Sequence, residues 1–299
     1  MRRSAPNEED AMANDIVGFI GLGNMGRPIA ENIAAAGWNM VVHDIAGTQA
    51  RAPKGTRIAG SAAAVARDSN LIFLSLPSVA ASEAVVAEIA AAGPPEDAVV
   101  VNTSTIGPDA ALAAIAVLEA RGIGYVDAPI SGSTFRARDG TLAVMYSGDE
   151  ATLARLRPLF ETYGNKIFDI GRAPGSAQRM KLVNNSIAIS SFVTISEALA
   201  MGVAGGLEVP AMLDVINASS GHGFVVEKLF IENVASERYR SESTAKIAGK
   251  DIALFVEAAA AVGSRHDAIG AASATFEEFR ESDPEADQLR IFPYISGEQ

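Results

Sequence analysis

A lysine and an asparagine one helical turn apart are the residues of this chain best placed to do chemistry. Lys181 and Asn185 fall within the stretch Gly175 to Asn185, which opens the longest helical pattern in the sequence. Their spacing of four residues puts both side chains on one face of a helix. A cation beside an amide near a helix start can hold a hydroxyl group and remove its proton, although most helical lysines are simply solvated. The pair therefore predicts acid–base chemistry if the rest of the chain builds a substrate site around it.

A glycine-rich turn lies near the start of the chain. The apolar run from Ile16 to Ile20 leads directly into a Gly-x-Gly-x-x-Gly sequence, and a helical pattern follows. Gly21 permits the tight turn, Gly23 lets the backbone approach a pyrophosphate, and Gly26 permits close packing of helix on strand. The N-terminus of the following helix offers N–H groups and a positive dipole to phosphates. In this context the motif predicts a dinucleotide site formed by Gly21, Leu22, Gly23, Asn24, Met25 and Gly26.

An acidic residue ends the next apolar run. Asp44 follows the glycines at the spacing of about twenty residues that the dinucleotide fingerprint expects. A carboxylate there accepts hydrogen bonds from both ribose hydroxyls and repels a 2′-phosphate, so it favours NAD over NADP. Asp44 also suits a turn or cap, and Arg51 is close enough in sequence to keep NADP open.

Polar and small residues follow several of the later strand patterns. Apolar runs predict further strands at 56–59, 71–76, 98–101, 125–130, 142–147 and 166–170, with helices between most of them. Ligands of open parallel sheets bind outside the carboxyl ends of the strands. This places four residues beside the cofactor, although each also suits a turn or a cap: Leu76, Pro77, Ser104 and Thr105. The loop of Ser131, Gly132 and Ser133 offers hydroxyl and backbone N–H groups, which suit a carboxylate.

The alternation of strands and helices ends at a glycine- and proline-containing stretch, residues 171–175. Beyond it, helical patterns cover 176–205, 210–218, 225–234, 243–262 and 268–280. The sequence therefore predicts an α/β fold in which a Rossmann-type, mostly parallel sheet domain is joined by a long helix to an all-α domain. The predicted segments are a disordered extension at 1–14, the dinucleotide-binding domain at 15–174 and the helical C-terminal domain at 175–299. The apolar surplus of the last segment suggests packing against another subunit.

Composition and charge narrow the class of protein. The formal net charge of -12 argues against a nucleic-acid surface, and the chain has no cysteine. The N-terminus has no apolar core typical of a secretion signal, and no apolar run approaches the length that spans a bilayer. The histidines show no metal-ligand spacing: His43, His222 and His266. These observations predict a cytoplasmic protein without metal, nucleic-acid or membrane partners.

Four stretches, taken in order, resemble the β-hydroxyacid dehydrogenase family, which includes 3-hydroxyisobutyrate dehydrogenases and tartronate semialdehyde reductases. They are residues 18–26, 127–132, 175–185 and 250–252, within a resemblance that extends from about Ile16 to Ala260. The resemblance implies that Lys181 is catalytic and that Asn185 helps to hold the substrate. It implies that Ser131, Gly132 and Ser133 bind the substrate carboxylate, and that Thr105 and Lys250 contact the cofactor. By pattern alone, Lys250 and Asp251 would be an exposed charged pair on a helix.

The resemblance also implies an activity and an assembly. The expected protein is an NAD(P)-dependent oxidoreductase that interconverts a small 3-hydroxy acid and its semialdehyde or keto acid by hydride transfer, with Lys181 as general acid/base. Burial in an interdomain cleft and a nearby cation, Lys250 or the oxidised nicotinamide, would lower the lysine pKa for this task. The helical domain would resemble that of 6-phosphogluconate dehydrogenase and form a homodimer or homotetramer.

Two departures and three alternatives accompany this expectation. Ala177 and Ser133 stand where the family usually has glycine, and the second change alters the shape of the substrate loop. An NADPH-dependent semialdehyde reductase, an imine reductase and a non-catalytic dinucleotide-binding module are the alternatives. Imine reductases of similar architecture typically lack the lysine, so Lys181 counts against that alternative. An intact glycine turn and lysine count against the non-catalytic module.

Overall fold

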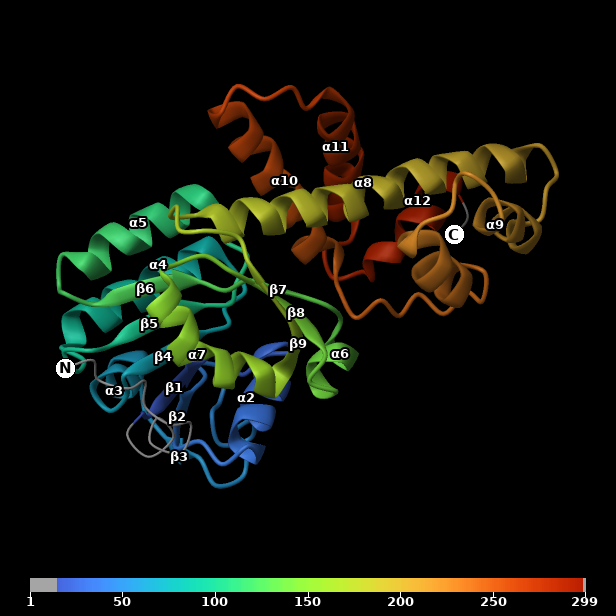
Figure 1. The fold of residues 1–299 in the computed structure, drawn as a ribbon. Coiled ribbons are helices and arrows are strands. Elements are labelled where there is room, and N and C mark those ends of the chain that lie inside the picture. The colour runs from blue at the N-terminus through green and yellow to red at the C-terminus, as the bar shows by residue number, and fades with distance from the viewer. Residues whose placement is uncertain (1–14, 298–299) are drawn as a thin grey trace. The chain divides into compact units, whose positions relative to one another are not determined.

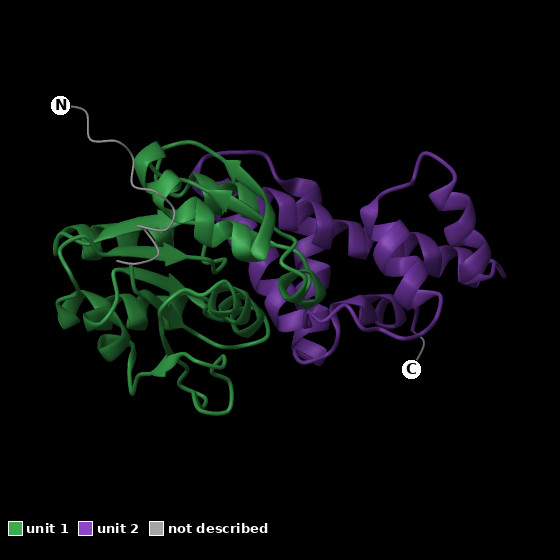
Figure 2. Cartoon of the chain, turned by 60° about the horizontal axis from the view of Figure 1, so that its bottom comes forward, with its two compact units in different colours: residues 1–181 green, residues 182–299 purple. Residues whose placement is uncertain are grey.

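The chain is described by a computed structural model that covers residues 15–297 (Figure 1). The predicted disordered extension at 1–14 lies outside the described residues. The chain forms two compact units, residues 1–181 and 182–299 (Figure 2). The division falls within helix α8 (Ser176–Ala204), whereas the sequence predicts a boundary just before that helix.

The first unit is built on a six-stranded parallel sheet with the strand order β3-β2-β1-β4-β5-β6. The order reverses between β1 and β4, which is the switch point of a doubly wound fold. The strands are short and, apart from the exposed edge strand β3, mostly apolar: β1 (Val17–Ile20), β2 (Met40–His43), β3 (Arg57–Ile58), β4 (Leu71–Leu74), β5 (Val99–Asn102) and β6 (Gly124–Asp127). The predicted Rossmann-type sheet is therefore confirmed.

Alternating side chains of this sheet enter two separate cores, because successive residues of a strand face opposite sides. Phe19 and Phe73 stack with ring centroids 6.0 Å apart in the core beneath α2 and α7. Ile20 and Ile72 lie in the other core, beneath α3, α4 and α5. The helices are α2 (Gly26–Ala35), α3 (Ala62–Arg67), α4 (Val79–Ala92), α5 (Pro108–Glu119) and α7 (Glu150–Tyr163). Ser61 caps α3, since its Oγ accepts the Ala64 N–H at 3.1 Å.

The last three strands of this unit form a second sheet with the order β7-β8-β9. They are β7 (Ile130–Ser131), β8 (Leu142–Tyr146) and β9 (Gly164–Asp169), and the β7–β8 pair is antiparallel. The sequence predicts β8 and β9 but places them in the same mostly parallel sheet, and it predicts one strand at 125–130 where the structure has β6 and β7 in different sheets. The chain leaves the first sheet at Pro129, which has no N–H to donate to a strand ladder. A short helix that the sequence did not predict, α6 (Thr134–Arg138), connects β7 to β8.

A cluster of charged and amide side chains joins the amino ends of the main strands to α7. Arg155 Nη2 lies 2.7 Å from Asp15 Oδ1 and 2.8 Å from Asp97 Oδ2. Asn70 Nδ2 donates to the same two carboxylates at 2.7 and 3.0 Å. Burial alone would raise the pKa of Asp97, but the hydrogen bonds from Asn70 and the Arg155 guanidinium more than offset it and lower that pKa. The cluster thus stabilises the sheet edge opposite the predicted ligand edge.

The second unit is helical, and within residues 182–297 it contains only an isolated bridge between extended residues. Its core is made by aromatic and aliphatic side chains, including Phe192, Phe230, Phe276 and Phe292. The elements that follow α8 are α9 (Val209–Asn217), the π-helical segment η1 (Val225–Val234), α10 (Ala245–Ala261), α11 (Asp267–Ser282), the 3₁₀ turn η2 (Gln288–Arg290) and α12 (Ile291–Ser296). The predicted all-α composition and terminal helix are confirmed.

Helix α8 corrects the expectation that no segment of the chain approaches the length and apolarity of a membrane span. By length and composition alone it is long and apolar enough to cross a membrane, although no uninterrupted apolar run of that length is present. Serine, threonine and alanine separate its larger apolar residues, so a search for continuous apolar runs misses it. One such helix is weak evidence for a membrane span, because core helices of soluble proteins pass the same test.

Candidate functional site

The glycine turn after β1 contains two glycines that the fold requires and one that it does not. Gly21 has a φ of +97°, and a Cβ there would lie 2.2 Å from the Ser75 carbonyl oxygen. A Cβ on Gly26 would lie 2.0 Å from the Gly21 carbonyl oxygen. A Cβ on the exposed Gly23 would meet no atom within 4 Å. The space at Gly23 is therefore open for a ligand to approach the backbone, and the turn fits a dinucleotide pyrophosphate.

The other residues of this turn divide between core and surface. Leu22 is buried and Met25 packs against the core beneath α2, whereas Asn24 is exposed. The side chains of Leu22 and Met25 thus hold the turn in place, and the backbone N–H groups remain the groups most suited to phosphates.

Asp44 lies at the carboxyl end of β2, directly beside the glycine turn. Its Oδ2 accepts the Leu22 N–H at 2.6 Å, and its Oδ1 accepts the Ala46 N–H at 2.7 Å. Arg51 Nη1 lies 3.5 Å from Oδ2. The carboxylate therefore stabilises two turns, as the turn interpretation predicts, and it also lies where the fingerprint expects a ribose.

The loops that follow β4 and β5 are joined to each other. The Leu76 N–H donates to Ser104 Oγ at 2.8 Å, and the Thr103 hydroxyl donates to the Leu74 carbonyl at 2.7 Å. Thr105 is half-buried and Pro77 is exposed on the same two loops. The structure thus brings the predicted cofactor residues of both loops to one edge of the sheet, with the Ser104 hydroxyl used to connect them.

Gln178, which the sequence analysis did not single out, anchors the first turn of α8 to this edge. Its side chain is fully buried and forms four hydrogen bonds. Oε1 accepts the N–H groups of Ile106 and Gly107 at 3.0 and 3.2 Å. Nε2 donates to the Ser104 carbonyl at 3.0 Å and to Asp127 Oδ1 at 2.9 Å. A neutral amide is suited to this place because two acceptors and two donors surround it.

Asp127, at the end of β6, is the buried carboxylate of this network. The Tyr125 hydroxyl donates to its Oδ1 at 2.9 Å and accepts from Asn102 Nδ2 at 3.1 Å. Burial raises the pKa of Asp127, although the hydrogen bonds from Gln178 and Tyr125 oppose that rise. Burial and the neighbouring Asp127 charge raise the pKa of Tyr125 well above its usual range. The network therefore fixes α8 to the sheet and does not release protons near neutral pH from its tyrosine.

Lys181 lies one turn further along α8 and is 8% exposed. It lies three positions after Gln178, so the two side chains leave neighbouring positions on the helix. The hydrogen bonds of Gln178 consequently set the position of the lysine relative to the loops after β5 and β6. Buried lysines are rare unless they have a partner or a task.

The predicted carboxylate loop connects β7 to α6. Gly132 has a φ of +138°, and a Cβ there would lie 2.7 Å from Leu142 Cδ2 and 3.2 Å from Arg136 Cβ. Ser131 is half-buried, whereas Gly132 and Ser133 are exposed. A glycine is thus required at this turn, and the Arg136 side chain packs directly against it.

In the second unit, the structure joins two residues that the sequence predicts separately. Asp251 Oδ2 accepts from Asn185 Nδ2 at 2.7 Å, and Asp251 Oδ1 lies 2.6 Å from Lys250 Nζ. Asp251 is 6% exposed, so the expectation of an exposed Lys250-Asp251 pair is wrong for its acidic member. Sequence reasoning did not assign Asp251 a role, because its partnership with Asn185 spans 66 positions.

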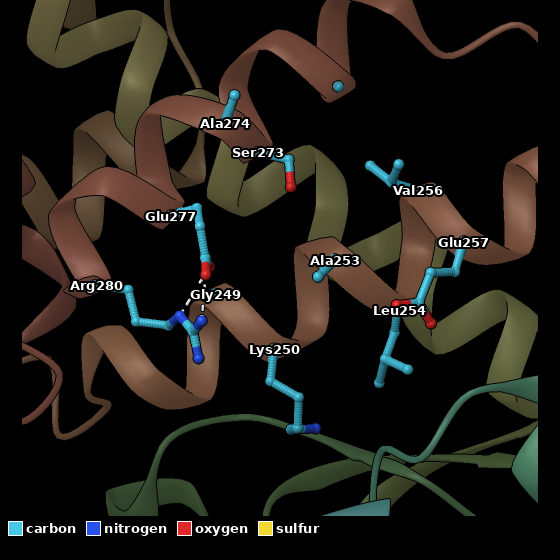
Figure 3. Close-up of a pocket in the computed structure, with 11 residues that line it drawn as sticks. Gly249, Lys250, Ala253, Leu254, Val256, Glu257, Ser273, Ala274, Glu277 and Arg280 are labelled. Carbon is cyan, nitrogen blue, oxygen red and sulfur yellow. Dashed lines mark hydrogen bonds and ion pairs between the residues drawn. The ribbon is translucent and has the colours of Figure 1, made fainter.

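A groove of about 490 Å³ runs between α10 and α11 (Figure 3). Lys250 stands at one side of it, and the ion pair of Glu277 with Arg280 closes another. Small residues of the two helices line much of the rest: Gly249, Ala253, Gly270, Ser273 and Ala274. Of the residues predicted to bind substrate or cofactor, Lys250 is the member that borders this groove.

The described residues give no sign of a histidine or metal centre beside the groups above. His222 is exposed, with Nε2 3.6 Å from Glu227 Oε2. Within residues 15–297, no group of three or more histidines and carboxylates is arranged to hold a metal ion.

Two family models match the chain and together span most of its length. A model described as the NAD binding domain of 6-phosphogluconate dehydrogenase matches residues 16–171. A model described as NAD-binding of NADP-dependent 3-hydroxyisobutyrate dehydrogenase matches residues 175–294. The first match includes the glycine turn, and both descriptions support NAD(P) as the cofactor.

Individual relatives point to the same chemistry. The NAD-dependent L-serine dehydrogenase of Pseudomonas aeruginosa is 35% identical, over 83% of this chain and 86% of that protein. The 2-(hydroxymethyl)glutarate dehydrogenase of Eubacterium barkeri is 32% identical, over 81% of each chain. The structure of Mycobacterium tuberculosis 3-hydroxyisobutyrate dehydrogenase with L-serine superposes with a TM-score of 0.85 at 26% identity, covering 94% of this chain and 99% of that one.

Proposed function

Because the chain belongs to the β-hydroxyacid dehydrogenase family, we propose that Lys181 is its general acid/base and that its substrates are small 3-hydroxy acids. Membership makes the protein an NAD(P)-dependent oxidoreductase of hydroxy acids. The observation that carries the lysine assignment is its burial on α8, one turn after a glutamine whose four hydrogen bonds fix that helix to the ligand edge of the sheet.

The proposed reaction uses the residues of this edge in separate tasks. NAD(P), when bound, supplies the hydride acceptor for oxidation and the hydride donor for reduction. Lys181 Nζ takes the hydroxyl proton as the carbinol C–H bond breaks, and returns it when the carbonyl is reduced. Asn185, one turn along α8, orients the hydroxyl. The loop of Ser131, Gly132 and Ser133 fixes the carboxylate, and the Arg136 side chain beside Gly132 adds a positive charge.

The substrate class follows from a fragment that the named compounds share. L-Serine, 2-(hydroxymethyl)glutarate and 3-hydroxyisobutyrate all contain a hydroxymethyl group next to the carbon that bears the carboxylate. We assign this HOCH₂–CHR–COO⁻ fragment to the present chain. The group R differs among the three compounds, and Ser133 stands where the family usually has glycine in the carboxylate loop, so R is where this enzyme's specificity is set.

The proposed cofactor preference is NAD, with Lys250 and Thr105 among its contacts. A 2′-phosphate beside Asp44 would meet a nearly buried carboxylate, and like charges at this distance repel. Arg51 offsets part of that charge at 3.5 Å, so NADP is expected to be used less efficiently and not to be refused.

The proposed setting is a cytoplasmic homodimer or homotetramer without nucleic-acid or membrane partners. Exposed apolar side chains of the second unit support self-association: Val183, Ile187, Met201, Leu207 and Val215. Size-exclusion chromatography with light scattering tests the assembly, and a monomer at micromolar concentration would contradict it.

A panel of acids tests the proposed activity. The panel contains 3-hydroxyisobutyrate, L-serine, glycerate and 2-(hydroxymethyl)glutarate with their aldehydes, each with NAD(H) and NADP(H), and cyclic imines as the competing class. We expect turnover with at least one HOCH₂–CHR–COO⁻ compound and a higher kcat/KM with NAD. Turnover confined to imines with NADPH would favour the imine reductase alternative, and turnover with no compound would contradict the proposed substrate class.

A further inference from the structure

A buried carboxylate in the second unit holds both of the polar residues that this unit is predicted to contribute to the reaction. Asp251 lies on α10, is 6% exposed, and uses one oxygen for each partner. Oδ2 accepts from Asn185 on α8 at 2.7 Å, and Oδ1 pairs with Lys250 at 2.6 Å. A carboxylate that is removed from water needs such donors, because an unpaired buried charge is costly.

The contact determines which way the Asn185 amide points. An ionised carboxylate only accepts hydrogen bonds, so the Asn185 NH₂ group must face Asp251. The amide oxygen then faces away from Asp251 and accepts from Asn184 Nδ2 at 3.1 Å. A carbonyl oxygen can accept two hydrogen bonds, so this contact alone does not saturate it. Asp251 therefore presents Asn185 as an acceptor, which is the role that orienting a hydroxyl toward a base requires.

The same carboxylate restrains Lys250. A lysine side chain has four rotatable bonds, and an exposed ammonium samples many positions. The Lys250 side chain is 24% exposed, and its ion pair with Asp251 restrains the ammonium at 2.6 Å from Oδ1.

From these contacts we infer that Asp251 is a positioning residue for the reaction: it orients the Asn185 amide and fixes the Lys250 ammonium, without itself contacting substrate or cofactor. The inference rests on the proposed function, because it needs Asn185 and Lys250 to act in the site. It adds to that function one residue, Asp251, which affects the reaction by positioning Asn185 and Lys250.

The test compares Asp251→Asn with Glu278→Gln, an equally isosteric loss of one carboxylate at an exposed position of the neighbouring helix α11. Steady-state kinetics use the best substrate of the wild-type enzyme at saturating NAD(H). For D251N we expect kcat to fall about tenfold or more, because a misplaced orienting group can cost up to about a hundredfold. For E278Q we expect kcat and KM within about twofold of wild type. Asp251→Glu should recover part of the rate, because it restores an acceptor-only group.

Two further measurements separate positioning from folding. Circular dichroism and thermal unfolding establish that D251N is folded at the assay temperature. In an Asn185→Ala background, adding D251N should reduce kcat by a smaller factor than it does in wild type, because one of its two routes of action is already lost. A folded D251N with wild-type kcat and KM, or an unchanged factor in the N185A background, would overturn the inference. Absence of turnover in the wild-type enzyme would instead count against the proposed function.

Discussion

Replacing Gln178 with alanine tests whether the network at the start of α8 holds the lysine in place. The substitution leaves four buried groups without this partner: two backbone N–H groups, the Ser104 carbonyl and the Asp127 carboxylate. A buried polar group without a partner costs roughly 1–3 kcal/mol, and water entering the vacated volume recovers part of that. We expect the free energy of unfolding to fall by about 3–5 kcal/mol, a large share of the roughly 5–15 kcal/mol of a typical domain.

The expected effect on activity follows from the same geometry. Lys181 is one turn from Gln178, so a loosened first turn displaces its Nζ, and kcat should fall by about tenfold or more. Urea unfolding followed by circular dichroism measures the stability, and NADH absorbance measures the rate. The matched control is Gln49→Ala, since Gln49 is exposed. A Q178A variant within about 1 kcal/mol of wild type and with an unchanged kcat would refute this reasoning.

A second substitution at the same position checks the polarity of the network. Gln178→Glu keeps the two acceptor contacts but places an oxygen against the Ser104 carbonyl and the Asp127 carboxylate. It should destabilise the protein at neutral pH, and part of the loss should return on acidification, when a protonated carboxyl group can donate. A loss that does not depend on pH would show that volume, and not hydrogen bonding, matters at this position.

The remaining predictions concern the glycine turn and the charged cluster. Gly23→Ala should leave the unfolding temperature unchanged but weaken NAD(H) binding in calorimetry by about tenfold or more. Gly21→Ala should destabilise the fold by about 1–3 kcal/mol or more, because of its φ of +97° and the overlap with Ser75; equal stability of the two variants would contradict this. The pKa of Asp97 is lower in the folded protein than its ordinary value near 4. The ionised carboxylate therefore stabilises the fold at pH values above about 4, and this contribution is lost as the pH falls through the folded-state pKa. Arg155→Met should therefore reduce stability at neutral pH and differ less from wild type below about pH 3; a constant difference across that range would contradict the ion-pair explanation.

The doubly wound sheet could be predicted because its signals are local. Short apolar runs mark the strands, Gly21 and Gly26 are required by a turn within one segment, and Asp44 follows at a fixed spacing. The second sheet and α6 could not be separated from the first by such signals. Its strands look like any other apolar run, and the five-residue α6 is too short to show a helical period.

The supporting residues of the site could not be predicted from pattern, because their importance depends on contacts that are distant in sequence. Gln178 is an ordinary helical glutamine until the loop 71 to 74 residues earlier folds against it. Asp251 beside Lys250 looks like a surface pair until Asn185, 66 positions away, donates to it. Lys181 could be singled out by its spacing from Asn185 and by the family motif, but the network of Gln178 that fixes its helix could not.

The measurement that tests the central claim most directly is turnover by Lys181→Ala and Lys181→Arg, compared with their binding of NAD(H). Both variants should bind NAD(H) within about threefold of wild type in calorimetry, because the glycine turn and Asp44 are untouched. Both should lose at least about a thousandfold in kcat: alanine has no group to exchange the proton, and the arginine guanidinium does not release one in proteins. Near-wild-type turnover by K181A, with intact NAD(H) binding, would contradict the assignment of Lys181 as the general acid/base.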